Sequence, residues 1–229
     1  MLNIYDLKVE YQKNPLGLDV KNPGFSWKLR SEANDVMQKC YRLLVKKVGI
    51  PVWDSGQIES DQSTNVMYQG EDLEPCTRYE IQAEIRDNQG EVAEQISWFE
   101  TGLMGHQNFQ GKWITHTFED DLAAPAIFSK QFIISKKVVS ARLYVSALGI
   151  YDLTLNGRAV SDTRFSPGWT NYKERLQYQT YDITSLLSGD NHLEITVGNG
   201  WLYITGGKIS VDGFMEYYVC RRRCCDSKG

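Results

Sequence analysis

The feature that most constrains the fold is a strict alternation of apolar and polar residues in the segment RYEIQAEIRDNQG, residues 78–90. Tyr79, Ile81, Ala83 and Ile85 fall on one side of an extended chain, and charged or amide side chains alternate with them. This period of two is typical of a β-strand that buries one face. The turn formers of residues 87–90 then predict a reversal of the chain.

Shorter segments of the same kind fill the rest of the first hundred residues. FSWKL directs Phe25, Trp27 and Leu29 to one face, and EQISWFETG is expected to return from the turn with Ile96 and Trp98 on the buried face. Together with LKVEY, YRLLVKKV, PVWDS and NVMYQ they give about seven strands, which is the number typical of a β-sandwich.

A tyrosine stands at the start of the most regular strand, in the segment LEPCTRY. Two interpretations of Tyr79 remain open. Its hydroxyl can return to the upstream backbone, as in the tyrosine corner of such sandwiches, or the ring can simply be part of the core. Either role is structural.

The second half of the chain is also predicted to be β. SARLYVSAL places Ala141, Leu143, Val145 and Ala147 on one face. In YDLTLNGRAV the pair Asn156-Gly157 separates two alternating segments, which is the strongest short signal for a hairpin. Further on, Asp182 is expected to cap a short helical turn that buries Ile183, Leu186 and Leu187.

Between the halves, the glycine-rich segment TGLMGHQNFQGKW breaks the alternation and marks a domain boundary. Its Met104 and Phe109 indicate packing against a neighbour rather than a free tether. We therefore predict a first sandwich over residues 1–103, a linker over 104–112 and a second sandwich over 113–201. Residues 202–229 form a tail that matches neither pattern.

The composition excludes several classes of protein. The net charge of −4 gives no reason to expect a nucleic-acid partner, and no apolar run reaches membrane length. Five cysteines and an N-terminus without the apolar core of an export signal favour reduced thiols and a cytoplasmic location. The terminal run CRRRCC fits no common zinc spacing, so we expect no metal and no other cofactor.

Longer segments resemble the N-terminal region of bacterial α-L-rhamnosidases, glycoside hydrolase family 78. ARLYVSALGIYDLTLNGRAV, FSPGWTNYKERLQYQTYDITSLL and NHLEITVGNGW resemble that family's N-terminal β-sandwich. NPLGLD, PGFSWKL, VWDSGQI and RYEIQAEIRDNQG resemble the fibronectin type III-like module that precedes it. The resemblance covers about residues 7–201 and is expected to stop after Trp201. It implies an all-β chain, with a fibronectin type III-like sandwich followed by a jelly-roll, galactose-binding-like one.

The resemblance also implies partners and an activity for a longer parent protein. Members of the family hydrolyse terminal α-L-rhamnosides with inversion, in a catalytic (α/α) barrel that lies C-terminal to this region. The expected partners are therefore that barrel, as part of the same polypeptide, and a rhamnose-containing glycan. A homodimer is a further expectation, because a surface that normally faces the barrel would be left bare.

Catalytic chemistry itself is not expected within these residues. An inverting glycosidase needs an acid and a base about 6.5–9.5 Å apart, and no pair of carboxylates in the sequence stands out as such. Glu119, Asp120 and Asp121 form the densest acidic cluster and are expected to be a solvated loop, with a structural calcium site as the alternative. The scattered His106, His116 and His192 are expected in loops or at the surface.

The aromatic stretch of residues 166–187 is the candidate binding site. Trp169, Tyr172, Tyr178 and Tyr181 can be packing or inter-domain contacts, and this interpretation leads. The alternative is that Trp169 and Tyr172 stack on sugar rings while Asn171 and Arg175 donate hydrogen bonds, with Trp201 nearby. We predict a non-catalytic N-terminal region of a glycosidase. The alternative is a stand-alone carbohydrate-binding or adhesion module.

Overall fold

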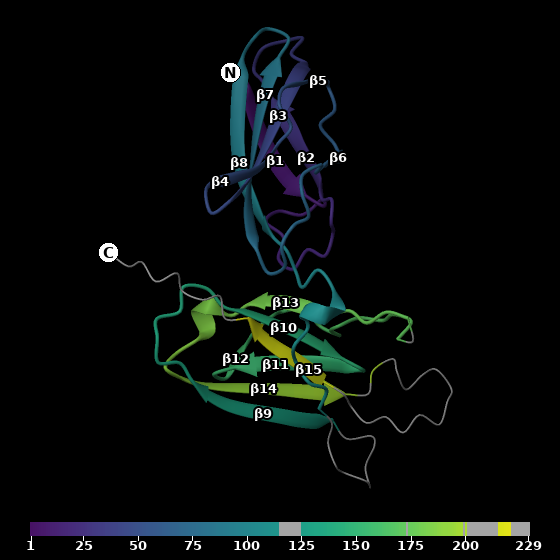
Figure 1. Ribbon diagram of the computed structural model, residues 1–229, viewed down its shortest axis with the longest axis vertical. Helices are drawn as coiled ribbons and strands as arrows, with labels where there is room; N and C mark the ends of the chain where they lie inside the picture. Colours follow the sequence, from purple (N-terminus) through teal and green to yellow (C-terminus); the bar gives the residue numbers. More distant parts are fainter. Residues whose placement is uncertain (115–124, 173, 199, 201–214, 221–229) are drawn as a thin grey trace. The chain divides into compact units, whose positions relative to one another are not determined.

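The computed structural model describes residues 1–114, 125–172, 174–198, 200 and 215–220, the last range by its backbone alone. The chain divides into two compact units, residues 1–108 and 109–229. Every strand pair in the described residues is antiparallel, apart from one isolated bridge, and Figure 1 shows each unit as an arrangement of β-sheets. The prediction of an all-β chain is confirmed. The two short helical turns in the described part of the chain lack the length and apolar character to cross a membrane.

The first unit is a sandwich of two sheets. One sheet has the order β1-β2-β6 and the other the order β4-β3-β7-β8, with β5 paired to β3. The strands are β1 (Asn3–Val9), β2 (Gly24–Arg30), β3 (Gln38–Lys47), β4 (Ile50–Asp54), β5 (Ile58–Glu59), β6 (Val66–Met67), β7 (Arg78–Asp87) and β8 (Val92–Glu100). The short helical turn η1 (His106–Asn108) follows them.

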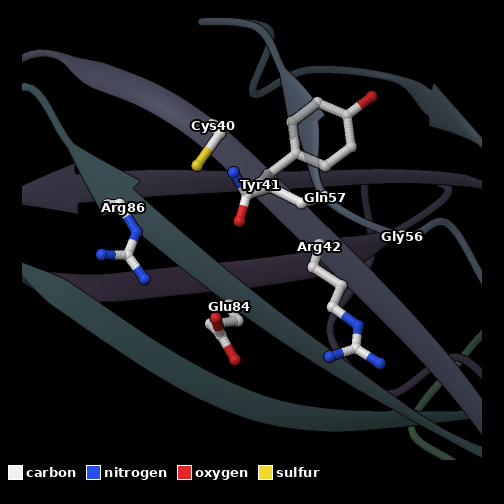
Figure 2. Close-up of a pocket in the computed structure, with 7 residues that line it drawn as sticks. All are labelled: Cys40, Tyr41, Arg42, Gly56, Gln57, Glu84 and Arg86. Carbon is white, nitrogen blue, oxygen red and sulfur yellow. The ribbon is translucent and has the colours of Figure 1, made fainter.

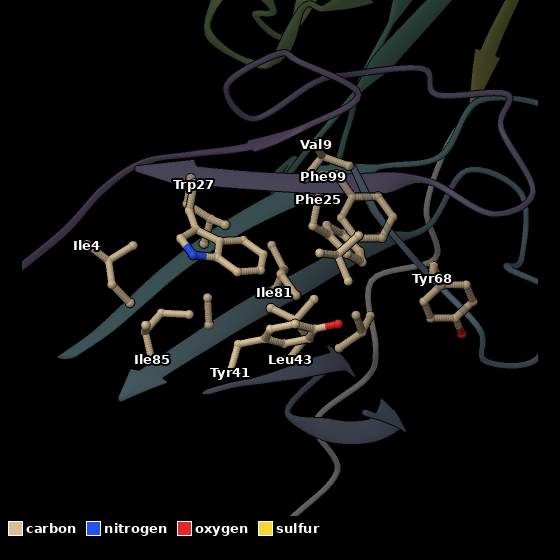
Figure 3. Packing of buried hydrophobic residues seen from close by; sticks show 14 of the residues in the cluster. Ile4, Val9, Phe25, Trp27, Tyr41, Leu43, Tyr68, Ile81, Ile85 and Phe99 are labelled. Carbon is tan, nitrogen blue, oxygen red and sulfur yellow. The ribbon is translucent and has the colours of Figure 1, made fainter. Parts of the chain in front are cut away.

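The core of the first unit is built around aromatic rings, which Figure 3 shows between the two sheets. The Trp27 and Tyr41 rings meet edge to face at 5.4 Å, and Tyr79 stacks on Phe99 at 5.3 Å. The indole nitrogen of Trp27 donates to the side-chain oxygen of Gln38 at 2.9 Å, so its one polar group is satisfied inside the core. Such offset aromatic pairs stabilise a core beyond the area that they bury.

The prediction for the strand of residues 78–87 is confirmed. Tyr79, Ile81, Ala83 and Ile85 are all buried on β7. The following turn is closed by the carboxylate of Asp87, which accepts the backbone N–H groups of residues 89 and 91. Turns of this kind suit an aspartate because its short side chain reaches the backbone two residues on.

Of the two interpretations of Tyr79, the corner is the one that the structure supports. The backbone N–H of Glu74 donates to the Tyr79 hydroxyl oxygen at 2.9 Å. The ring is 3% exposed, so it also belongs to the core. One side chain thus packs the interior and fixes the loop before β7.

The predicted buried face of β8 is wrong, because the residues that face the core alternate one position away from those predicted. Ile96 is 54% exposed and Trp98 is half-buried, whereas Ala93 and Phe99 face the core. The guanidinium of Arg78 lies 4.0 Å from the centre of the Trp98 ring, on the outer face. A cation stacked on an aromatic ring stabilises it at a surface position.

The second unit contains two further sheets, shown in Figure 1. In its described part the sheet orders are β13-β10-β15 and β12-β11-β14-β9. The strands are β9 (Ala126–Ile133), β10 (Arg142–Ala147), β11 (Ile150–Leu155), β12 (Arg158–Ala159), β13 (Gln179–Asp182), β14 (Asp190–Gly198) and β15 (Met215–Cys220), with the helical turn η2 (Thr184–Leu186) between β13 and β14. A single apolar cluster from both sheets forms the core.

Of two local predictions for this unit, the hairpin turn is confirmed and the capped helical turn is correct only in part. The Asn156-Gly157 turn joins β11 to β12, and both residues have positive φ, at 54° and 72°. The predicted cap is not Asp182, because the N-cap of η2 is Ile183 and no side-chain capping bond forms. The Asp182 carboxylate still accepts the backbone N–H of Thr184 at 3.0 Å, and Ile183 is buried as predicted. Leu186 and Leu187 are only partly buried against the same core.

The predicted boundaries of the linker stay predictions, but the structure places its two apolar residues. Met104 packs against the core of the first unit, and the Phe109 ring contacts Tyr178 within the second.

The prediction that the tail lies outside the fold needs a correction. Strand β15 pairs with β10 along its whole length, so residues 215–220 belong to the sheet rather than lying outside the fold.

Replacing Tyr79 with phenylalanine should lower the free energy of opening of β7 by about 1–3 kcal/mol, because the Glu74 N–H loses its buried acceptor. Native-state hydrogen exchange of the β7 amides measures this quantity. Tyr11→Phe is the control, since Tyr11 is 61% exposed, and it should leave the exchange unchanged. Equal effects of the two substitutions would show that the corner does not stabilise the strand.

Candidate functional site

The candidate site is the loop of residues 165–178, which leads from the β11–β12 hairpin to β13 and is called here the aromatic loop. Its two ends are bound to the second sandwich by different contacts. One end reaches the interior of the sandwich, and the other lies over the outer face of β10.

The first anchor is a cluster of hydroxyl and amide groups in the interior. The hydroxyl oxygens of Tyr151 and Tyr181 lie 3.0 Å apart, and the Tyr151 hydroxyl donates to the side-chain oxygen of Gln179 at 3.1 Å. The amide nitrogen of Gln179 in turn donates to the Pro167 carbonyl at 2.9 Å, and the backbone of Tyr151 donates to that of Ser166 at 2.8 Å. Ser166 is 3% exposed, so this end of the loop is buried.

Burial keeps the hydroxyl of this cluster protonated. The pKa of Tyr151 is raised well above its ordinary value because the phenol is desolvated and lies beside the Tyr181 hydroxyl. A neutral phenol keeps its proton as a hydrogen-bond donor throughout the physiological pH range. The cluster therefore stabilises the attachment of the loop and does not act as an acid or a base.

The second anchor covers the outer face of β10. Tyr144 and Ser146 point away from the apolar core, yet they are only 0% and 2% exposed. The Ser146 hydroxyl donates to the Gln177 carbonyl at 2.7 Å, and the rings of Tyr144 and Tyr178 lie 5.9 Å apart. The sequence alternation predicted burial of only one face of β10. The aromatic loop buries part of the other.

Between its anchors the loop folds on itself. The Asn171 carbonyl accepts the backbone N–H groups of residues 174 and 175, each at 2.9 Å, and the Thr170 hydroxyl donates to the Arg175 carbonyl at 2.7 Å. Gly168 has a φ of 100°, a conformation that side chains with a Cβ rarely adopt. These contacts make the middle of the loop compact, so its exposed side chains are held by the loop's own backbone.

The structure separates the predicted site residues into two groups. Trp169 is 64% exposed, and Asn171 and Arg175 are also at the surface. Tyr172 is half-buried, and its hydroxyl donates to the Gly168 carbonyl at 3.4 Å, while burial raises its pKa. Tyr178 and Tyr181 are the packing residues that the leading interpretation of the sequence expects. Trp201 lies outside the described residues, so its predicted role stays a prediction.

The sequence pattern did not identify Phe165 as an exposed aromatic residue of this loop. Phe165 is 64% exposed and has a φ of 60°, immediately before the buried Ser166. The sequence signal that could have identified Phe165 is its position directly before the turn-forming residues Ser-Pro-Gly. Phe165 and Trp169 thus stand on either side of the buried anchor, and their aromatic surfaces suit the apolar faces of sugar rings.

The first unit has a separate shallow pocket of about 140 Å³ on the outer face of β3 and β7. Figure 2 shows its lining, in which Arg42 and Arg86 come from neighbouring strands together with Glu84. Arg42 is engaged already, because its guanidinium donates to both carboxylate oxygens of Asp54 at 2.9 and 2.5 Å. This hydrogen bonding lowers the pKa of Asp54 to about 2.

The histidines and acidic groups do not assemble into a reaction centre within the described residues. His106 is exposed, and His192 lies 2.8 Å from the Ser129 hydroxyl on an open sheet face. No cluster of ligating side chains suited to a metal occurs among the described residues. His116 and the cluster of residues 119–121 lie outside that part of the chain.

Two known domain families match most of the chain. Residues 4–105 match the Rha78A-like, N-terminal immunoglobulin domain, and residues 136–219 match the alpha-L-rhamnosidase N-terminal domain. The second match extends well past Trp201, which corrects the expected end of the resemblance and agrees with the place of β15 in the sheet.

Individual relatives give the same result. An alpha-L-rhamnosidase of Formosa agariphila is 31% identical over 83% of this chain, and one of an Alteromonas species is 31% identical over 82%. The solved alpha-L-rhamnosidase from Dictyoglumus thermophilum superimposes with a TM-score of 0.83 at 34% identity over 94% of this chain. That from Aspergillus terreus superimposes with a TM-score of 0.79 at 27% identity over 96%.

The matched region is a small part of each of these proteins. The chain spans 23% and 22% of the two curated relatives and 27% of each solved structure. The relatives therefore continue far beyond the two matched domains. Their activity as whole proteins does not by itself describe these two domains.

Replacing Gly168 with alanine should loosen the aromatic loop by more than about 1 kcal/mol, because alanine is strained at a φ of 100°. Trypsin cleavage after Arg175 should accelerate about fivefold or more. Gly189→Ala is the matched control, since no atom lies within 4 Å of the added methyl group, and it should leave cleavage unchanged. Equal cleavage rates in all three proteins would mean that the loop is not held in the described conformation.

Replacing Arg42 with glutamine should return the pKa of Asp54 from about 2 toward its ordinary value of 3.8. Because the folded-state pKa is depressed, this ion pair stabilises the fold fully above about pH 4 and less as the pH falls toward 2. NMR titration of the Asp54 carboxyl group measures the shift. Arg86→Gln is the control from the same pocket, and a similar shift in that variant would contradict the assignment.

Proposed function

The chain carries the N-terminal immunoglobulin-like and β-sandwich domains of the α-L-rhamnosidase family, and from this premise we propose that it is the non-catalytic N-terminal region of such an enzyme. The parent activity would be hydrolysis of terminal α-L-rhamnosides. The observation that carries the proposal is the match over both domains, together with the small share of each relative that they represent.

The chemistry of the described residues favours a structural role over a catalytic one. Inverting glycoside hydrolysis needs two carboxyl groups that face one sugar across a space of about 6.5–9.5 Å. The most strongly perturbed carboxylates, Asp6 and Asp54, are both held ionised by cations, and the causes are local ion pairs. Neither has the raised pKa that a general acid requires.

A bracing role follows from the family's organisation. The catalytic (α/α) barrel of the same polypeptide is the proposed partner of the two sandwiches. A cytoplasmic location belongs to the same proposal. So does self-association of the two domains when they are prepared without the barrel, since a surface that faces the barrel would then be exposed.

Contact with glycan is the finer part of the proposal. The aromatic loop presents Trp169 with Asn171 and Arg175 at its surface, and its two anchors hold that arrangement without a ligand. A pre-formed site spends less free energy on ordering when a sugar binds. We propose that these residues contact a rhamnose-containing glycan beside the catalytic barrel.

The first test is activity. The isolated chain should release no aryl group from an aryl α-L-rhamnoside at about 100 μM protein, because a pair of facing carboxylates is required. A heat-treated sample is the control. Turnover above that control would overturn the non-catalytic role.

The second test is binding. Trp169→Ala should weaken binding of a neutral rhamnose oligosaccharide by up to about tenfold, because a stacking aromatic contributes about 0.5–1.5 kcal/mol. Isothermal titration calorimetry measures the affinity. Tyr11→Ala is the control, as Tyr11 is a similarly exposed ring on the other unit. Unchanged affinity of the Trp169 variant would remove the loop from the proposed glycan contact.

A further inference from the structure

The outer face of β1 and β2 in the first unit carries a concentration of positive charge that the proposed function does not use. Lys8 and the bulge beside it lie on β1, Lys28 and Arg30 lie on β2, and Lys13 follows β1 closely in the chain. The pairing of the two strands sets Tyr5 opposite Lys28. We call Lys8, Lys13, Lys28 and Arg30 the basic patch.

One carboxylate gathers three of these cations. The ammonium nitrogens of Lys8, Lys13 and Lys28 lie 3.1, 3.2 and 3.2 Å from the carboxylate oxygens of Asp6. Hydrogen bonds from the lysines, from Lys8 above all, lower the pKa of Asp6 to about 2, so it is ionised at every physiological pH. Asp6 and the three lysines together therefore carry a net charge of +2.

The backbone places Asp6 where all three lysines reach it. Asp6 has a φ of 58°, in the left-handed region, and the pairing of β1 with β2 shifts register between Tyr5 and Lys8. A bulge of this kind turns a side chain in a direction that the regular strand would not allow. The conformation of the bulge therefore positions the Asp6 carboxylate so that all three lysines can pair with it.

The cations remain open to solution. The side chains of Lys13 and Lys28 are 69% and 61% exposed, so the donors that Asp6 leaves unused face solvent. The Arg30 guanidinium lies 5.1 Å from the centre of the Tyr5 ring, which holds a fourth charge above the same strands. By contrast, Lys46 and Lys47 each pair with a separate glutamate elsewhere in the unit.

We propose that the basic patch binds the anionic groups, carboxylate or sulfate, of an acidic polysaccharide. The proposal rests on the proposed function in so far as the partner is a glycan. Ammonium groups on flexible stems suit anionic groups that recur along a polymer, because each makes a point-charge contact without demanding one geometry. The chain as a whole has a net charge of −4, so attraction for a polyanion has to come from a local concentration of positive charge such as this one.

The test uses the whole chain and the double substitution Lys13→Gln and Lys28→Gln. Both side chains are exposed and Lys8 remains beside Asp6, so the thermal melting temperature should fall only slightly. Affinity is measured by calorimetry at low salt for polygalacturonate, which carries carboxylates, and for dextran sulfate. The double substitution should weaken binding to the preferred polymer about tenfold or more, and added salt should weaken binding by the unaltered chain. The polymer that binds more tightly identifies the anionic group.

The matched control is Lys21→Gln with Lys39→Gln, which makes the same charge change at two exposed lysines outside the patch. This control should keep its affinity within about twofold. Failure of the unaltered chain to bind either polymer would overturn the proposal, and so would equal losses in the two double variants. Equally tight binding of duplex DNA would replace a glycan partner with a general polyanion.

A separate arm distinguishes this proposal from the proposed function. Binding of the neutral rhamnose oligosaccharide tests the aromatic loop and should be unaffected by the lysine substitutions, because a neutral sugar gains nothing from the patch. Loss of neutral-sugar binding in the Trp169 variant alone supports the loop, whereas loss of polyanion binding in the lysine variant alone supports the patch.

Discussion

The second unit depends on the burial of both faces of its strand β10. The inner face supplies apolar side chains to the core, and Leu143 and Val145 are fully buried there. The outer face would expose Tyr144 and Ser146, but the aromatic loop lies over them. A polar hydroxyl can be buried at low cost only when it is hydrogen-bonded. The bond from Ser146 to the Gln177 carbonyl meets that condition and fixes the loop at the same time.

This constraint explains why only part of the aromatic stretch is available for binding. Tyr178 covers the outer face of β10 and Tyr181 joins the interior cluster, so turning either ring toward a ligand would break these packing contacts. Trp169, Asn171 and Arg175 lie between the anchors and are exposed. The same loop thus completes the fold with its ends and offers a candidate sugar surface with its middle. The basic patch of the first unit is independent of it, since its residues lie on another domain.

The local signals in the sequence were sufficient for most of the β-structure. The alternation before Asp87 and the Asn156-Gly157 turn depend on neighbouring residues alone, so both could be predicted. The Tyr79 corner could be proposed, but choosing it over a plain core position needed the bond to Glu74.

Where the predictions were wrong, distant contacts decided the outcome. On β8 the larger side chains of Ile96 and Trp98 suggested the buried face. Phe99 and Ala93 take that face instead, and the inward Gln95 keeps an oxygen that is buried without a hydrogen-bond partner among the described residues. The stacking of Arg78 on Trp98 could not be read from either strand alone. Likewise, strand β15 pairs with a partner about seventy residues earlier, and no local pattern marks it.

The most direct test of the account is native-state hydrogen exchange in the chain with Tyr178→Ala, compared with Trp169→Ala. If the aromatic loop covers β10, loss of the Tyr178 ring should lower the free energy of opening of the β10 amides and of the Arg175 amide together, by about 1–3 kcal/mol. Loss of the exposed Trp169 ring should leave the β10 amides unchanged. Full protection of β10 in the Tyr178 variant, with exchange accelerated only in the loop, would contradict the claim that the loop is part of the fold.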